Sequence, residues 1–259
     1  GREQAGMLSS MFNVYSSQDQ YRQSLACARR AAAICKDIGE HDWQAGLQLA
    51  IGYTLTRLGH YDEAISTFLG LMPAGETPGD SASYARLVHG LGLAFLYKGE
   101  FENSRKHLLA SLDVFEQLKD TPSVAEVNGH LGELFYSSNF ADSARRRFET
   151  ASGMADELED RDIGIRASAY LAALKARAGE RDGSIQQLRR LVAEAEDNDL
   201  WQAQLTAQRL LGQTLLAPRT DEASHADGRN NLQQALSLAT QKEYAPEIER
   251  ITTILQQQP

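Results

Sequence analysis

The feature that most constrains the fold of this chain is a repeat of 40 residues. A large apolar residue followed by a small one recurs at Ile51-Gly52, Leu91-Gly92, Leu131-Gly132, Leu171-Ala172 and Leu211-Gly212, and stepping back by 40 adds an N-terminal copy. A period of this length is typical of solenoids, in which each repeat packs on its neighbours. We therefore predict a single domain spanning 1–259, with repeats at 5–44, 45–84, 85–124, 125–164, 165–204 and 205–242.

Each repeat begins with a predicted amphipathic helix. When the repeat is numbered from 1 to 40, positions 3, 7 and 11 are almost all apolar, as at Leu47, Ile51 and Leu55. Such an i, i+4, i+8 stripe marks one face of an α-helix. Position 8 is Gly or Ala in five copies. Because glycine inside a helix costs about 1 kcal/mol relative to alanine, its repetition indicates close approach by a neighbouring helix.

A turn and a second helix complete the repeat. Position 15 holds Gly59, Gly99, Asn139 and Gly179, residue types that tolerate the left-handed conformation after a helix end. In the second helix, position 20 is small and position 24 is usually large, as at Phe68. A small residue that faces a large one lets antiparallel helices interlock. The predicted fold is therefore all-α.

Both ends of the array depart from this pattern. In the first repeat the sizes at positions 8 and 24 are exchanged, with Phe12 against Ala28. In the sixth, four extra residues lie within 217–225, between the two helices. With that shift, Ile251 takes position 3 of a further helix. We expect this helix, about 243–257, to cap the apolar end of the stack, as solenoids require.

Composition and charge narrow the function. The chain carries 26 Lys and Arg against 35 Asp and Glu, and this net charge of -9 opposes binding to nucleic acid. It has no apolar run of the roughly 18 to 20 residues that span a bilayer, and no secretory signal. Cys27 and Cys35 match neither a disulfide framework nor a zinc site, so we expect reduced packing residues. These features predict a cytoplasmic protein that contacts neither nucleic acid nor membrane.

Catalytic and cofactor motifs give no support for an enzyme. Gly90-Leu91-Gly92 resembles the start of a dinucleotide motif, but it lies inside a predicted helix without a preceding strand or a third glycine. His89 and His130 lack the carboxylate or cysteine partner that a metal site needs. We therefore expect no catalytic residue, no metal and no cofactor.

The second copy resembles a tetratricopeptide repeat along its whole helix-turn-helix pattern. The residues that carry this resemblance are Ile51-Gly52, Leu55, Gly59, Tyr61, Ala64, Phe68 and Leu71. The period exceeds the family's usual length of about 34 residues. It is similar to the extended repeats of cell-polarity adaptors, kinesin light chains, bacterial peptide-pheromone receptors and large bacterial signalling ATPases. The resemblance implies a right-handed superhelical solenoid of six repeats that binds a protein segment on its concave face.

The resemblance also indicates which side chains line that concave face, because positions 2, 5, 9, 12 and 13 supply it in the family. In this chain the candidate binding residues are Asn13, Tyr53, Arg57, Arg86, His89, Tyr97, Glu133, Tyr136, Arg166, Arg177, Arg209 and Gln213. Arginine and tyrosine are enriched at binding hot spots, and arginine pairs well with carboxylates. An acidic or C-terminal peptide is the expected partner, although solvated arginines neutralised by nearby Glu126 and Glu133 are the alternative.

The expected function is that of a non-catalytic scaffold for another protein or peptide. Recognition of a chaperone tail is not expected, because Ser9, Ala50 and Gly90 replace residues of the family's carboxylate clamp, although Asn13 and Arg86 match it. The alternative function is a ligand- or peptide-sensing regulatory domain of a larger signalling protein or transcription regulator. The pattern selects no homo-oligomeric interface and leaves such an assembly open.

Overall fold

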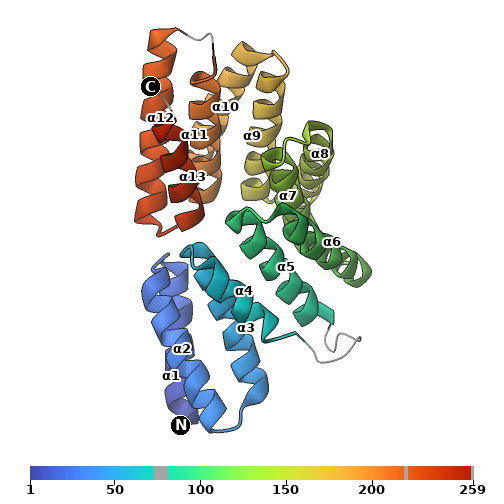
Figure 1. Cartoon of the computed structure of the whole chain (residues 1–259), viewed down its shortest axis with the longest axis vertical. Coiled ribbons are helices and arrows are strands. Elements are labelled where there is room, and N and C mark those ends of the chain that lie inside the picture. Colours follow the sequence, from blue (N-terminus) through green and yellow to red (C-terminus); the bar gives the residue numbers. More distant parts are fainter. Residues whose placement is uncertain (73–80, 219–220, 258–259) are drawn as a thin grey trace. The chain divides into compact units, whose positions relative to one another are not determined.

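The computed structural model describes residues 1–72, 81–218 and 221–257. In this part of the chain all regular structure is helical, and thirteen helices follow one another in helix-turn-helix pairs (Figure 1), so the predicted all-α fold is confirmed. None of them is both long enough and apolar enough to cross a lipid bilayer. The helices are α1 (Arg2–Ser17), α2 (Tyr21–Asp37), α3 (His41–Arg57), α4 (Tyr61–Leu69), α5 (Ser81–Lys98), α6 (Phe101–Leu118), α7 (Thr121–Ser137), α8 (Ala141–Leu158), α9 (Arg161–Arg177), α10 (Arg181–Asp197), α11 (Trp201–Leu215), α12 (Glu222–Gln241) and α13 (Ala245–Gln256).

The helices form two compact units, each with its own apolar core. The first unit contains Gly1–Val114 and Lys242–Pro246, and the second contains Phe115–Gln241 and Glu247–Pro259. In the first core Leu55 and Phe68 are fully buried, and in the second Leu188 has the same role. The organisation of the chain as a single domain stays a prediction.

Close contacts between small and large residues lock the two helices of a pair together. A Cβ atom added to the glycine at position 8 would lie 2.4 to 2.7 Å from a side-chain carbon of the paired helix, which is shorter than a carbon contact allows. These contacts join Gly52 to Phe68, Gly92 to Leu108, Gly132 to Phe148 and Gly212 to Leu232. The predicted packing of a small position 8 against a large position 24 is thereby confirmed.

Left-handed residues end the helices at steps of 20 residues, except between Gly59 and Gly99, where residues 73–80 lie outside the described part. Positive φ angles occur at Asp19, Gly39, Gly59, Gly99, Lys119, Asn139, Glu159, Gly179 and Asp199. The amide after each of them donates to a carbonyl five residues earlier, as from Glu100 to Phe95 at 2.9 Å. This Schellman arrangement satisfies carbonyl groups that a helix end leaves open. The last such residue, Glu243, lies four residues beyond the 40-residue step from Asp199, in agreement with the predicted insertion, of which residues 219 and 220 lie outside the described part.

Candidate functional site

Polar side chains from the first helices of three successive pairs meet in the second unit. Helix α9 contacts both α7 and α11, so these three helices lie side by side. We call the surface that they present the A face, and we define it by Glu133, Tyr136, Tyr170, Arg177, Arg209 and Gln213.

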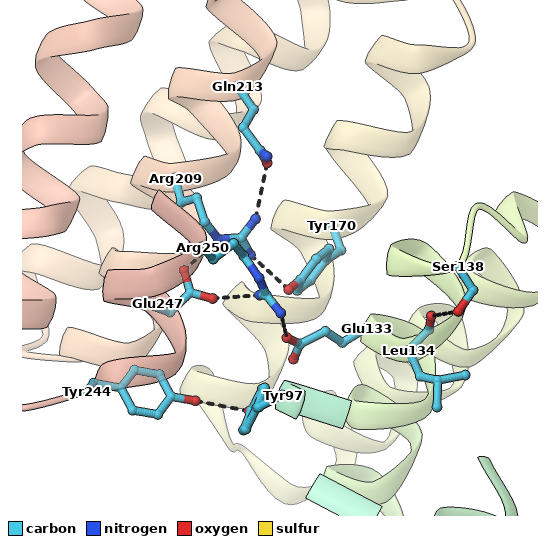
Figure 2. Close-up of polar contacts among 10 residues, drawn as sticks. All are labelled: Tyr97, Glu133, Leu134, Ser138, Tyr170, Arg209, Gln213, Tyr244, Glu247 and Arg250. Atoms are coloured by element: carbon cyan, nitrogen blue, oxygen red, sulfur yellow. Dashed lines mark hydrogen bonds and ion pairs between the residues drawn. The ribbon is translucent and has the colours of Figure 1, made fainter. Parts of the chain in front are cut away.

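Arg209 is the centre of the A face, and only 2% of its surface is exposed. Its Nε donates to Oε2 of Glu247 at 2.6 Å, and its Nη2 donates to the hydroxyl of Tyr170 at 2.9 Å (Figure 2). Its Nη1 donates to Oε1 of Gln213 at 3.1 Å. A buried guanidinium is tolerated only when its donors are used in this way and its charge is balanced.

A second ion pair extends the contacts of Arg209 to α7 and completes a cluster of four charged residues, Arg209, Glu247, Arg250 and Glu133. Arg250 lies 2.8 Å from Oε1 of Glu133 through Nη2, and its Nη1 donates to Oε1 of Glu247 at 2.6 Å (Figure 2). Glu247 therefore bridges two arginines, one on α11 and one on α13. Two carboxylates balance two guanidinium groups, so the cluster as a whole carries no net charge.

Burial and charge act on the cluster in opposite directions. Burial is the largest single influence on the pKa of the Arg209 guanidinium and lowers it, but the attractions of Glu247, Tyr170 and Glu133 together outweigh burial, so the pKa is raised. Burial also raises the pKa of the hydroxyl groups of Tyr170 and Tyr136. Both phenols therefore stay protonated near neutral pH and act as neutral hydrogen-bonding groups.

Aromatic rings connect the cluster to an exposed arginine. The guanidinium of Arg177 lies 3.8 Å from the centre of the Tyr136 ring, a cation-π contact. The Tyr136 ring meets the Tyr170 ring edge-on at 5.0 Å, and the Tyr170 ring stacks on Phe148 at 4.5 Å. The A face thus runs from the buried Arg209 to the exposed Arg177.

The segment that supplies both Glu247 and Arg250 is α13. These residues lie three apart, so they project from the same side of the helix. Next to them Ile251 is fully buried. The A face therefore holds a helix of the chain itself.

The first unit carries a related but separate set of contacts. The hydroxyl of Tyr53 donates to the backbone carbonyl of Arg86 at 2.6 Å and lies 3.3 Å from Nδ1 of His89. The guanidinium of Arg57 lies 5.7 Å from the centre of the Tyr244 ring. The hydroxyl groups of Tyr97 and Tyr244 are 3.0 Å apart.

The predicted binding residues differ widely in exposure. Asn13, Arg86 and Arg177 are exposed, and His89, Tyr136 and Arg209 are buried. The half-buried ones are Tyr53, Arg57, Tyr97, Glu133, Arg166 and Gln213. The structure joins five of the twelve in the A face, whereas Arg166 pairs with Asp162 on its own helix at 2.7 Å. Their contact with a partner stays a prediction.

Sequence reasoning missed Tyr170, Glu247 and Arg250. Tyr170 occupies position 6, outside the positions that the family uses, but a single tyrosine among the alanines of 167–176 is a signal that could have found it. The opposite charges of Glu247 and Arg250, one helical turn apart, are a second such signal. In the described residues, no group of three or more His, Cys, Asp and Glu side chains could hold a metal ion.

No protein-family model matches the chain, and no similar sequence is found among curated proteins. Solved structures do match. The apo form of RapI has a TM-score of 0.72 at 16% identity, over 92% of this chain and 84% of that one. A Rap protein complexed with Competence and Sporulation Factor has a TM-score of 0.64 at 14% identity, over 98% and 75%.

A third match is a tetratricopeptide repeat protein from Parabacteroides merdae ATCC 43184. Its TM-score is 0.51 at 13% identity, and the alignment covers 95% of this chain and 99% of that one. Identities this low establish the fold and leave function to be argued from the site. Together with the 40-residue repeat, these matches show that the chain has the fold of the tetratricopeptide-repeat solenoids.

Proposed function

We propose that this chain is a non-catalytic scaffold that binds a segment of another protein on the first helices of its repeats. The observation that carries this proposal is that the A face already holds a helix, α13, through charges and hydrogen bonds. A surface that binds one helical segment through these ion pairs and hydrogen bonds has the chemical groups to bind another. The solenoid fold agrees with this role, because stacked repeats offer an extended surface of many small contacts.

Two exposed arginines indicate the charge that we expect the partner to carry. Arg177 presents its guanidinium beside the Tyr136 ring, and Arg86 lies exposed in the first unit. Arginine forks pair with carboxylates, and buried tyrosines supply rigid apolar area with a polar end. We therefore propose an acidic or C-terminal peptide as the partner. We place the chain in the cytoplasm, because its cysteines, Cys27 and Cys35, are free thiols.

A regulatory sensor is the second candidate. The specific observation in its favour is that one solved protein of the same fold was crystallised with Competence and Sporulation Factor. Under this second candidate function, the solenoid belongs to a larger signalling protein or transcription regulator and changes conformation when a ligand binds.

Affinity capture from a lysate of the source cells tests the scaffold. We expect the wild-type chain to retain a partner that the Arg86→Glu, Arg177→Glu variant loses. The matched control is Arg145→Glu with Arg146→Glu, because these arginines are also exposed but project from α8, a second helix. The two variants change the net charge equally, and all three chains should melt at similar temperatures. Equal capture of the partner by both variants would refute the proposed binding site at Arg86 and Arg177.

A further inference from the structure

Helix α13 is attached to the second unit by apolar side chains and by charges. Of its apolar side chains, Ile251 is fully buried, whereas Ile248, Ile254 and Leu255 remain partly exposed. Ile248, Ile251 and Leu255 form one stripe along α13. On the same helix the side chain of Glu247 is only 7% exposed, so a charged group is also buried in this contact. An attachment of this kind depends on charge complementarity.

The charged groups of the A face are placed to pair with the acid and the base of α13, in that order along the helix. Arg209 meets the carboxylate of Glu247 at 2.6 Å, and Glu133 meets the guanidinium of Arg250 at 2.8 Å. The bonds to Tyr170 and Gln213 fix the Arg209 guanidinium in one orientation. The face therefore distinguishes a helix with an acid followed by a base one turn later from a helix with the reverse order.

Another helix that takes the place of α13 would have to satisfy the same groups. Arg209 and Glu133 lie on different first helices, and each forms its direct ion pair with a residue of α13. A charge that is buried without its partner costs several kcal/mol. Only a segment that brings a carboxylate to Arg209 and a cation to Glu133 avoids this cost.

We propose that α13 is a built-in occupant of the partner site, and that the A face selects a helix carrying Asp or Glu followed three residues later by Arg or Lys. This inference rests on the proposed scaffold function and specifies its partner. The partner and α13 compete for Arg209 and Glu133. Binding of the partner displaces α13 from the second unit.

A labelled peptide of residues 243–257 tests the proposed preference for an acid followed three residues later by a base. The test does not require the partner to be known. The receiving chain carries Glu247→Ala, Arg250→Ala and Ile251→Ala, which weaken its own α13. In fluorescence anisotropy, we expect this chain to bind the peptide about tenfold more tightly than the wild-type chain does. A peptide with residues 247 and 250 exchanged has the same composition, and it should bind about tenfold more weakly.

The wild-type chain provides a second readout that does not depend on the folding of a variant. Hydrogen exchange measured by mass spectrometry follows the amides of α13 in the wild-type chain, and peptides made with heavy isotopes keep their own fragments apart in mass. We expect excess native peptide to accelerate exchange in α13 and the exchanged peptide to leave it unchanged. Equal effects of the two peptides, or no effect of either, would overturn the proposal.

These results can be separated from those of the capture experiment. If the peptides act alike while capture still depends on Arg86 and Arg177, the role of α13 is refuted and the scaffold stands. If the native peptide binds more tightly than the exchanged one while capture does not depend on Arg86 and Arg177, the selection of an acid followed by a base on the A face is supported. The proposed contacts of those two arginines with the partner are then refuted.

Discussion

Two glycines of α7 allow the packing between repeat helices to be measured. A Cβ atom added to Gly132 would lie 2.6, 2.7 and 2.8 Å from three carbons of the Phe148 ring. A Cβ atom added to Gly129, nearly one turn earlier, would meet nothing within 4 Å. Phe148 is 1% exposed and stacks on Tyr170, so its ring cannot move aside without disturbing the A face.

Alanine is expected to be less favourable at Gly132 than at Gly129. At both, alanine gains about 1 kcal/mol over glycine through its helix propensity. At Gly132 the added methyl group also overpacks the core, which costs about 1–3 kcal/mol. Gly129→Ala should therefore stabilise the chain by about 1 kcal/mol, and Gly132→Ala should be about 1–3 kcal/mol less stable than Gly129→Ala. The difference isolates the packing cost, because the propensity gain is common to both.

Urea unfolding followed by far-UV circular dichroism measures this difference from the shift in midpoint. A thermal melt should show a gap between the variants of about 2–4 °C per kcal/mol. If Gly132→Ala were as stable as Gly129→Ala, the close approach of α7 and α8 would not hold. The account of position 8 as a packing position would then be wrong.

Three further predictions concern a turn, the thiols and pH. Lys119, directly after α6, has a φ of 57°, which strains a residue with a side chain, so Lys119→Gly should stabilise the chain by about 1 kcal/mol in urea unfolding. Lys106→Gly, inside α6, should instead destabilise the chain by about 1 kcal/mol. Cys27 and Cys35 are buried, and burial raises the pKa of the Cys35 thiol, so a thiol reagent should label neither in the native chain and both after unfolding; rapid native labelling would contradict their placement. Burial, together with Lys106, lowers the pKa of His107 in the folded chain, so the unfolded chain takes up that proton first. Stability should fall as pH drops below about 6.5, and a loss in His107→Gln as large as in the wild-type chain would show that another group causes it.

Much of the fold could be predicted because the repeat places the same residue types at the same helical positions. Gly52 and Gly132 occupy close approaches that any larger residue would obstruct, so sequence and structure carry the same information there. The left-handed turn at Gly99 was predictable for a similar reason. The turns at Lys119 and Glu159 were not, because these residues have no intrinsic preference for that conformation, and the surrounding helices impose it.

The candidate site was only half predictable. The family positions lead to Arg209 and Glu133, because both project from first helices at fixed places in the repeat. Their actual partners, Glu247 and Arg250, lie far along the chain in a helix that the sequence pattern marks only as a cap. A pattern of apolar positions predicts which side of a helix is buried, but it does not predict which charges it meets.

The most direct test of the central claim is photo-crosslinking from the A face. A photoreactive amino acid replaces Arg177 in one chain and Arg146, on α8, in a control chain, and mass spectrometry identifies what each captures from the source lysate. The account predicts that a partner protein crosslinks at position 177 and not at 146, through a segment with an acid three residues before a base. A partner that crosslinks at 146 and never at 177 would contradict it.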